Sequence, residues 1–134
     1  MKIGIIGSGD VGRVLGAGFI KEGHEVLLGT RDINKEAVVN WLANNPNSQV
    51  GSFADAAAFG ELIVLATAGD ITEAVIESAG IANFDSKIVI DATNPISHAK
   101  PPVNSVLQFF NTAAGSLMEH LQNLVPDAKF VKAF

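Results

Sequence analysis

The sequence predicts an α/β protein, a doubly wound parallel sheet of about six strands that forms one domain over residues 1–134. Three observations predict this class. Short apolar runs alternate with segments whose apolar residues recur at helical spacing. The run at 61–66 (ELIVLA) is almost entirely apolar, as strands covered on both faces are. The chain also opens with a strand, a glycine-rich turn and a helix, which is the usual start of such a sheet.

The opening segment carries the strongest functional signal. Residues 2–6 form an isoleucine-rich strand that runs into Gly7, Gly9 and Gly12, spaced G-x-G-x-x-G, before a helix from about Asp10. The first glycine permits a tight turn, the second lets a pyrophosphate approach the backbone, and the third lets the helix pack close to the strand. Unpaired N–H groups at the helix start attract an anion. The segment predicts a dinucleotide site of the Rossmann type, whereas a tight turn without a ligand explains only one or two of the glycines.

The other elements follow from the same patterns. The first helix is expected to end at Gly23 and to present one apolar face with Val11, Val14, Leu15, Gly18 and Phe19. In the second helix, packing is expected from Val38, Trp41 and Leu42. Asp70 is expected to cap the fourth helix. The later helices are expected at 34–44, 52–59, 71–79 and 113–124, and the later strands at 25–29, 49–52, 61–66, 87–91 and 127–134.

The end of the second strand distinguishes the two nicotinamide cofactors. NAD sites place a carboxylate about 20 residues past the glycines, where it accepts hydrogen bonds from the ribose 2′-OH. Here the strand ends in Thr30 and Arg31, a hydroxyl and a guanidinium that both suit a 2′-phosphate, and Lys35 adds a further cation. This pattern favours NADP(H). Two alternatives stay open: an ordinary exposed loop arginine, and Asp32 turning inward to serve the 2′-OH of NAD.

Two further strand ends face the predicted crevice, because ligands of open α/β sheets bind beyond the carboxyl ends of the strands. Residues 66–70 follow the fourth strand and residues 92–95 follow the fifth, so both are expected to flank the ribose and diphosphate groups. The stretch 96–112 is long for a connection and is expected to cover the nicotinamide or contact a partner. His98 lies in it and is expected to be a solvated loop residue, the alternative being a proton donor to a carbonyl substrate.

Composition excludes several classes of function. The chain has no cysteine and a net charge of −5 at pH 7, and its apolar runs are too short for a membrane span. We therefore expect no disulfide and no membrane partner. The basic residues do not cluster, which argues against a nucleic-acid partner. The 3 histidines lack H-x-x-x-H spacing, so no metal site is predicted. A cytoplasmic location is expected.

Four pieces of sequence carry a family resemblance: GSGDVGR at 7–13, GTRD at 29–32, DATNP at 91–95 and VKAF at 131–134. On these pieces the chain resembles the NADP oxidoreductases that use the deazaflavin coenzyme. It is also similar to the cytosolic NADPH-binding domain of the six-transmembrane metalloreductases. The first piece is shared by many Rossmann proteins, whereas the strand-end pieces and the VKAF ending are more discriminating.

The resemblance implies an NADPH site and no catalytic side chain, because in such enzymes the hydride passes directly to a flavin-like ring or another acceptor. A flavin or deazaflavin is the implied acceptor. Ser8, Gly9, Asp10 and Val11 would hold the pyrophosphate. Thr30 and Arg31 would hold the 2′-phosphate. The ribose and nicotinamide side would be lined by Ala66, Thr67 and Asn94, with Ala133 near the nicotinamide.

Members of that family normally continue past the sixth strand with helices that complete the acceptor site and often a dimer. We therefore expect residues 1–134 to be the NADP-binding domain, with the C-terminal helical acceptor domain absent. Its expected partners are small molecules, the cofactor and the acceptor, and a homodimer is consistent with the resemblance. Two other functions stay open: the N-terminal domain of an imine or carbonyl reductase resembling pyrroline-5-carboxylate reductase, and a non-catalytic NADP-binding module.

Overall fold

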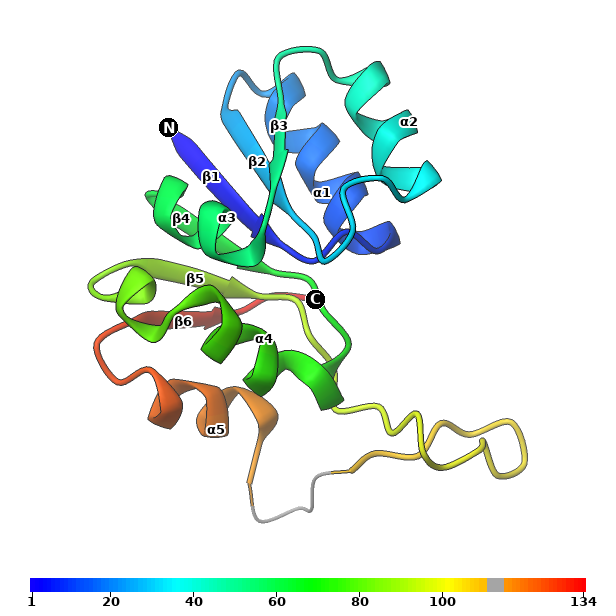
Figure 1. Cartoon of the computed structure of the whole chain (residues 1–134). Helices are drawn as coiled ribbons and strands as arrows, with labels where there is room; N and C mark the ends of the chain where they lie inside the picture. Colours follow the sequence, from blue (N-terminus) through cyan, green and yellow to red (C-terminus); the bar gives the residue numbers. More distant parts are fainter. Residues whose placement is uncertain (111–114) are drawn as a thin grey trace.

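The fold is a single parallel sheet of six strands (Figure 1), seen in a computed structural model that describes residues 1–110 and 115–134. Neighbouring strands follow the order β3-β2-β1-β4-β5-β6, and all five pairings are parallel. The predicted doubly wound class is therefore confirmed. The strands are β1 (Lys2–Ile6), β2 (Glu25–Gly29), β3 (Gln49–Gly51), β4 (Leu62–Leu65), β5 (Ile88–Asp91) and β6 (Lys129–Lys132).

Five α-helices cover the two faces of the sheet within the described residues. On one face lie α1 (Asp10–Lys21) and α2 (Glu36–Asn44), and on the other lie α3 (Phe53–Phe59), α4 (Thr72–Ala79) and α5 (Leu117–Leu124). Each face has its own apolar core. Central strand residues such as Ile5 and Val64 point toward α1 and α2, whereas Ile6 and Leu65 point toward the other three helices. This alternation follows from the period of two along a strand.

The inward side of α1 only partly matches the predicted apolar face. Leu15 and Phe19 pack against the core as predicted, but the fully buried positions of the helix are glycines. Val11 and Val14 are 51% and 70% exposed, whereas Gly12 and Gly16 are buried. A Cβ atom at Gly16 would lie 2.9 Å from the Trp41 ring. The helix therefore approaches too closely for side chains at those positions, and valine is displaced outward. Trp41 packs as predicted, and its ring N–H donates to the Arg13 carbonyl at 2.8 Å.

A short connecting helix, α3, is fixed at its start by a capping box. The Ser52 hydroxyl accepts from the Asp55 N–H at 3.1 Å, and the Asp55 carboxylate accepts from the Ser52 N–H at 2.8 Å. These reciprocal bonds satisfy two backbone donors that a helix start leaves unpaired. Hydrogen bonds from the Ser52 hydroxyl and then its backbone N–H lower the pKa of Asp55. The helix that begins at this capping box packs against β1 and β2.

Two helix starts differ from those predicted. The second helix begins at Glu36 rather than residue 34, and Lys35 is its N-cap residue. Before α4, a single 3-10 turn, η1 (Gly69–Ile71), takes the place of the predicted Asp70 cap. The Asp70 carboxylate instead contacts His98 Nδ1 at 2.8 Å. The predicted start of the fifth helix at residue 113 lies outside the described residues, and the described helix begins at Leu117 after the capping residue Ser116.

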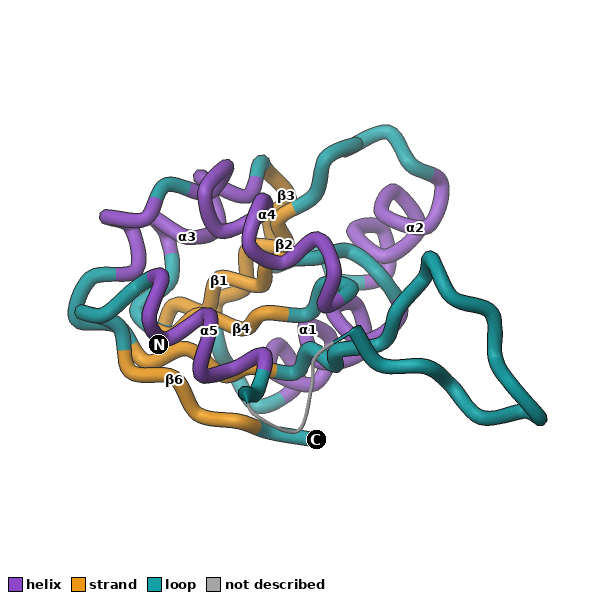
Figure 2. The backbone as a smooth tube through the Cα atoms, turned by 90° about the horizontal axis from the view of Figure 1, so that it is seen from below, coloured by secondary structure: helices purple, strands orange, loops and turns teal. Residues whose placement is uncertain are grey.

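Residues 96–110 form an arm that projects from the sheet and its helices in both views (Figure 2). Antiparallel pairing joins Ile96 to Phe109 at its base and Val103 to Val106 at its tip. The arm is the described part of the long connection that the sequence predicts over 96–112, and residues 111 and 112 lie outside the described residues. Within the described ranges, no helix has the length and hydrophobicity needed to cross a membrane.

Candidate functional site

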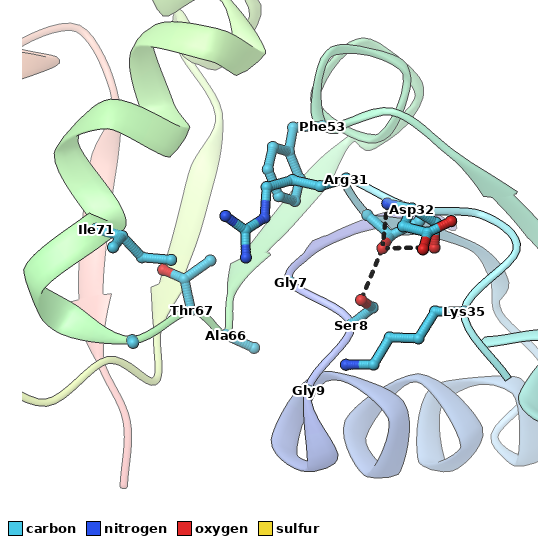
Figure 3. A pocket seen from close by; sticks show the side chains of 12 residues that line it. Gly7, Ser8, Gly9, Arg31, Asp32, Lys35, Phe53, Ala66, Thr67 and Ile71 are labelled. Atoms are coloured by element: carbon cyan, nitrogen blue, oxygen red, sulfur yellow. Dashed lines mark hydrogen bonds between the residues drawn. The ribbon is translucent and has the colours of Figure 1, made fainter. Parts of the chain in front are cut away.

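A cleft of about 260 Å³ opens at the carboxyl ends of β1, β2 and β4 (Figure 3). This is the edge where open α/β sheets hold ligands, because the strand order changes direction there. The cleft collects residues from the glycine loop, from the turn after β2 and from the loop after β4. Its lining comprises Gly7, Ser8, Gly9, Thr30, Arg31, Asp32, Lys35, Phe53, Ala66, Thr67, Ala68 and Ile71.

The three glycines of the loop differ in backbone conformation and in the space available for a side chain. Gly7 has φ +119°, and a Cβ there would lie 2.4 Å from the Ala66 carbonyl oxygen. A Cβ at Gly12 would lie 1.9 Å from the Gly7 carbonyl oxygen. Gly9 is different, because its φ is −70° and a Cβ there would meet nothing within 4 Å. The fold requires the first and third glycines, whereas the second keeps open a space that the protein itself does not fill.

That open space lies at the N-terminus of α1. Gly9 is the N-cap residue and provides no side-chain cap, so the backbone N–H groups of the first turn face outward. Together with the positive end of the helix dipole, they suit an anion such as a phosphate. The Asp10 carboxylate would oppose an anion, but the Arg13 guanidinium contacts it at 2.5 Å. The loop end of α1 therefore remains suited to a negatively charged group.

Arg13 also stabilises the loop from behind. Its Nη1 donates to the Ser8 carbonyl at 2.8 Å, and its side chain is only 21% exposed. One of the two arginines in the chain thus organises the glycine loop rather than lining the cleft. The sequence signal for this role is a single arginine one residue after the G-x-G-x-x-G.

The turn after β2 is joined to the glycine loop by hydroxyl groups. Thr30 Oγ1 lies 2.8 Å from Ser8 Oγ and accepts from the Asp32 N–H at 3.2 Å. Thr30 is buried, with 6% of its surface exposed. Its hydroxyl is therefore engaged by protein partners on two sides. This geometry holds the turn that presents Arg31 in a fixed relation to the loop.

Two cations line the cleft and extend into different parts of it. Arg31 and Lys35 both line it, and Figure 3 shows the Arg31 guanidinium extending between Phe53 and Thr67 while the Lys35 amine extends toward Ser8 and Gly9. Asp32 lines the cleft as well, and its Oδ1 accepts from the Asn34 N–H at 2.9 Å. The carboxylate that would serve an NAD ribose is thus engaged in a local turn, and positive charge predominates.

A second cavity, here called the apolar hollow, borders the first turns of α1. Its volume is about 370 Å³. Asp10 and Val11 line it but do not line the cleft, and residues of the loop after β5 line it as well. The hollow is lined by Asp10, Val11, Val14, Leu15, Ala92, Asn94 and Phe134. The exposure of Val11 and Val14, which a simple helical pattern did not predict, provides one apolar wall.

The structure thus distributes the sequence-predicted residues over two cavities. Eight of them line the cleft: Gly7, Ser8, Gly9, Thr30, Arg31, Lys35, Ala66 and Thr67. Asp10, Val11 and Asn94 line the apolar hollow. Gly12 is buried beneath the loop, and Ala133 lines neither cavity, although its N–H donates to the Asp91 carbonyl at 3.0 Å. No histidine of the described chain lines the cleft or the hollow, and His98 lies outside both.

Comparisons with known proteins agree with this geometry. A family model described as NADP oxidoreductase, coenzyme F420-dependent, matches residues 2–95. Among solved structures, a candidate F420-dependent NADP reductase from Arthrobacter sp. FB24 is 34% identical, with a TM-score of 0.90 over 98% of this chain. The match covers 61% of that protein, so this chain spans less than two thirds of its length. No curated protein sequence matches the chain.

Two more distant structures share the fold alone. An imine reductase from Streptomyces aurantiacus is 16% identical, with a TM-score of 0.67 over 98% of this chain and 40% of that one. A pyrroline carboxylate reductase from Plasmodium falciparum, solved with NADP bound, is 12% identical, with a TM-score of 0.54 over 100% of this chain and 57% of that one. All three neighbours are named as reductases.

Proposed function

This chain belongs to the family of coenzyme F420-dependent NADP oxidoreductases, and from that premise we propose that it binds NADPH across the two cavities. In this proposal the cleft takes the adenosine half with its 2′-phosphate. The N-terminus of α1 takes the pyrophosphate, and the apolar hollow takes the nicotinamide half. The chain then serves as the cofactor domain of an oxidoreductase that passes a hydride between NADP(H) and a deazaflavin or flavin acceptor.

The observation that carries the proposal is the open space at Gly9. A tight turn alone would not need this glycine, because its backbone conformation is one that any residue adopts and a Cβ would touch nothing. A phosphate at the helix start explains why a side chain is excluded there. The neighbouring cations Arg31 and Lys35 then explain which dinucleotide fits, since a 2′-phosphate adds charge that a guanidinium fork can pair with.

The lining of the apolar hollow supports the hydride-transfer part of the proposal. Among the described residues that line it, Asp10 is the only one with an ionisable side chain, and that carboxylate is paired with Arg13. NADPH supplies a hydride when it is bound, and transfer between two aligned rings needs orientation rather than a side-chain acid. An apolar wall that excludes water suits that task. A reduction of a carbonyl or an imine would instead call for a proton donor near the same place.

The apolar lining of the hollow also supports a second candidate, a non-catalytic NADP-binding module. A module that senses or holds NADP also needs the cleft but needs no acid or base. The two candidates differ in turnover and not in binding, so an activity measurement distinguishes them.

The test is NADPH oxidation by the purified chain with separate acceptors: coenzyme F420, a flavin, a cyclic imine and a carbonyl compound. The proposal expects oxidation with the deazaflavin or the flavin, and a matched loss in Arg31→Ala at subsaturating NADPH. Oxidation with the imine or the carbonyl alone would support the reductase alternative instead. NADPH binding without oxidation by any acceptor would favour the non-catalytic module.

A further inference from the structure

Two sequence motifs far apart in the chain meet at the end of the sheet. The DATNP segment at 91–95 closes β5, and the VKAF segment at 131–134 contains the end of β6. β5 and β6 pair in parallel, with Asp91 beside Lys132. Neither residue lines the cleft or the apolar hollow. The proposed cofactor site therefore leaves the side chains of both residues without a role.

Asp91 is a fully buried carboxylate, with 0% of its side chain exposed. One of its oxygens accepts from the Thr93 N–H at 2.8 Å and from the Thr93 hydroxyl at 2.6 Å. The other oxygen lies 3.4 Å from Lys132 Nζ. Lys132 also donates to the Thr93 carbonyl, so its ammonium group bridges the strand and the loop. We call this arrangement of Asp91, Thr93 and Lys132 the ion lock.

Burying a carboxylate costs free energy that its ion pair only partly offsets. The backbone pairing of β5 with β6 does not require the charges, since the same ladder forms between Val89 and Phe130. An ion pair with a buried carboxylate is weak evidence for stability, and our hypothesis is that this one fixes a local geometry. The geometry that this lock fixes is the path of the chain from Asp91 to Thr93.

The lock and the apolar hollow lie on opposite sides of the sheet end. Val89 belongs to the core beneath α4 and α5, and Phe130 packs against that core. Side chains alternate between the two faces along a strand. Asp91 and Lys132, two residues further on, therefore point to that same side. The residues between and after them reach the hollow: Ala92, Asn94 and Phe134 all line it.

The loop after β5 also contacts the end of β4 and the turn that follows it. A Cβ atom at Gly69 would lie 2.1 Å from the Asn94 carbonyl oxygen, so the turn after β4 packs directly against the loop. The Ala92 N–H donates to the Leu65 carbonyl at 3.0 Å. With the lock on one side and this contact on the other, the wall that faces α1 has little freedom to shift.

We propose that Lys132 and Asp91 are positioning residues for the nicotinamide half of NADPH, acting through the loop that carries Ala92 and Asn94. This inference rests on the proposed function. It assigns the lock no contact with the cofactor. We expect disruption of the lock to weaken binding of the half of the cofactor at the apolar hollow and to leave binding of the half in the cleft unchanged.

The test compares two ligands by calorimetric titration: NADPH, and 2′,5′-ADP, which carries the adenosine 2′-phosphate without the nicotinamide. Lys132→Met removes the ammonium group and keeps the stem. We expect it to weaken NADPH binding about tenfold and to leave 2′,5′-ADP binding within about twofold. Lys132→Arg should recover most of the NADPH affinity because it restores a donor to Thr93. Lys129→Met, an identical change at an exposed position of the same strand, is the matched control.

A second variant keeps the test informative if the first is unstable. Asp91→Asn retains an acceptor for Thr93 and removes the charge that faces Lys132. If the pair acts as one unit, Asp91→Asn with Lys132→Met should weaken NADPH binding no more than either change alone. Equal losses for both ligands, or no loss for NADPH, would overturn the inference. Failure of the unaltered chain to bind either ligand would instead refute the proposed function.

Discussion

Replacing Gly9 with serine should make the protein slightly more stable and weaken its binding of NADPH by roughly ten- to a hundredfold. Gly9 is the N-cap residue of α1, with φ −70° and ψ −176°, a conformation that serine adopts freely. A serine hydroxyl there accepts from a backbone N–H in the first turn and is worth a few tenths of a kcal/mol more than glycine. The added atoms meet no protein atom, because a Cβ at this position has nothing within 4 Å.

The same atoms would stand where the proposed pyrophosphate lies. Each charge-assisted hydrogen bond lost to the phosphate costs about 1.5–3 kcal/mol, which is roughly ten- to a hundredfold in affinity. Unfolding in urea gives the stability, and calorimetric titration with NADPH gives the affinity. The matched control is Gly12→Ser, whose Cβ would overlap the Gly7 carbonyl oxygen at 1.9 Å. We expect that change to cost about 1–3 kcal/mol of stability by overpacking.

Either of two results would refute this reasoning. If Gly9→Ser lowered the free energy of unfolding as much as Gly12→Ser, the space at Gly9 would not be open. If Gly9→Ser bound NADPH within about twofold of the unaltered chain, the phosphate would not lie at the start of α1.

Three further predictions follow from the same geometry. Arg31→Ala should weaken NADPH binding by about 1.5–3 kcal/mol and NADH binding much less, as measured by titration; equal losses would contradict a 2′-phosphate at this residue. Thr30→Val should lower the preference for NADPH because it breaks the hydroxyl link between Ser8 and the Asp32 turn, and Thr30→Ser should restore it; a preference unchanged in the valine variant would show that the link does not position Arg31. The folded protein lowers the pKa of Asp55, so the ionised carboxylate stabilises the fold at pH values above the unfolded pKa of about 3.9. This contribution is lost as the pH falls through the folded pKa. The chain should therefore be more stable than Asp55→Asn at neutral pH and not in acid, and a difference that persisted in acid would contradict the capping box as its source.

The strands and the main cleft could be predicted because local sequence determines them. Runs such as 62–66 are apolar throughout since both faces of the central strands are covered. The strand-end rule then brings Gly9, Arg31 and Thr67 to one edge without any knowledge of side-chain contacts. The glycine spacing identified the loop because the tight turn and the close packing of the helix start both depend on residues within the G-x-G-x-x-G segment.

Features that depend on distant partners were not predictable from local sequence. Asp70 has the residue type of a helix cap, but it is paired with His98, 28 positions away. The inward face of α1 is set by how closely the helix approaches Trp41, which a helical pattern of valines does not reveal. The contact between Asp91 and Lys132 joins strands 41 positions apart, and a lysine on an edge strand gives no local sign of such a partner.

The most direct test of the account is a side-by-side calorimetric titration of this chain with NADPH and NADH. We predict saturable binding of NADPH and binding of NADH weaker by at least about tenfold, because Arg31 and Lys35 line the cleft to which the 2′-phosphate is assigned. Equal affinity for the two nucleotides would contradict that assignment. Absence of binding by either would contradict the dinucleotide site itself.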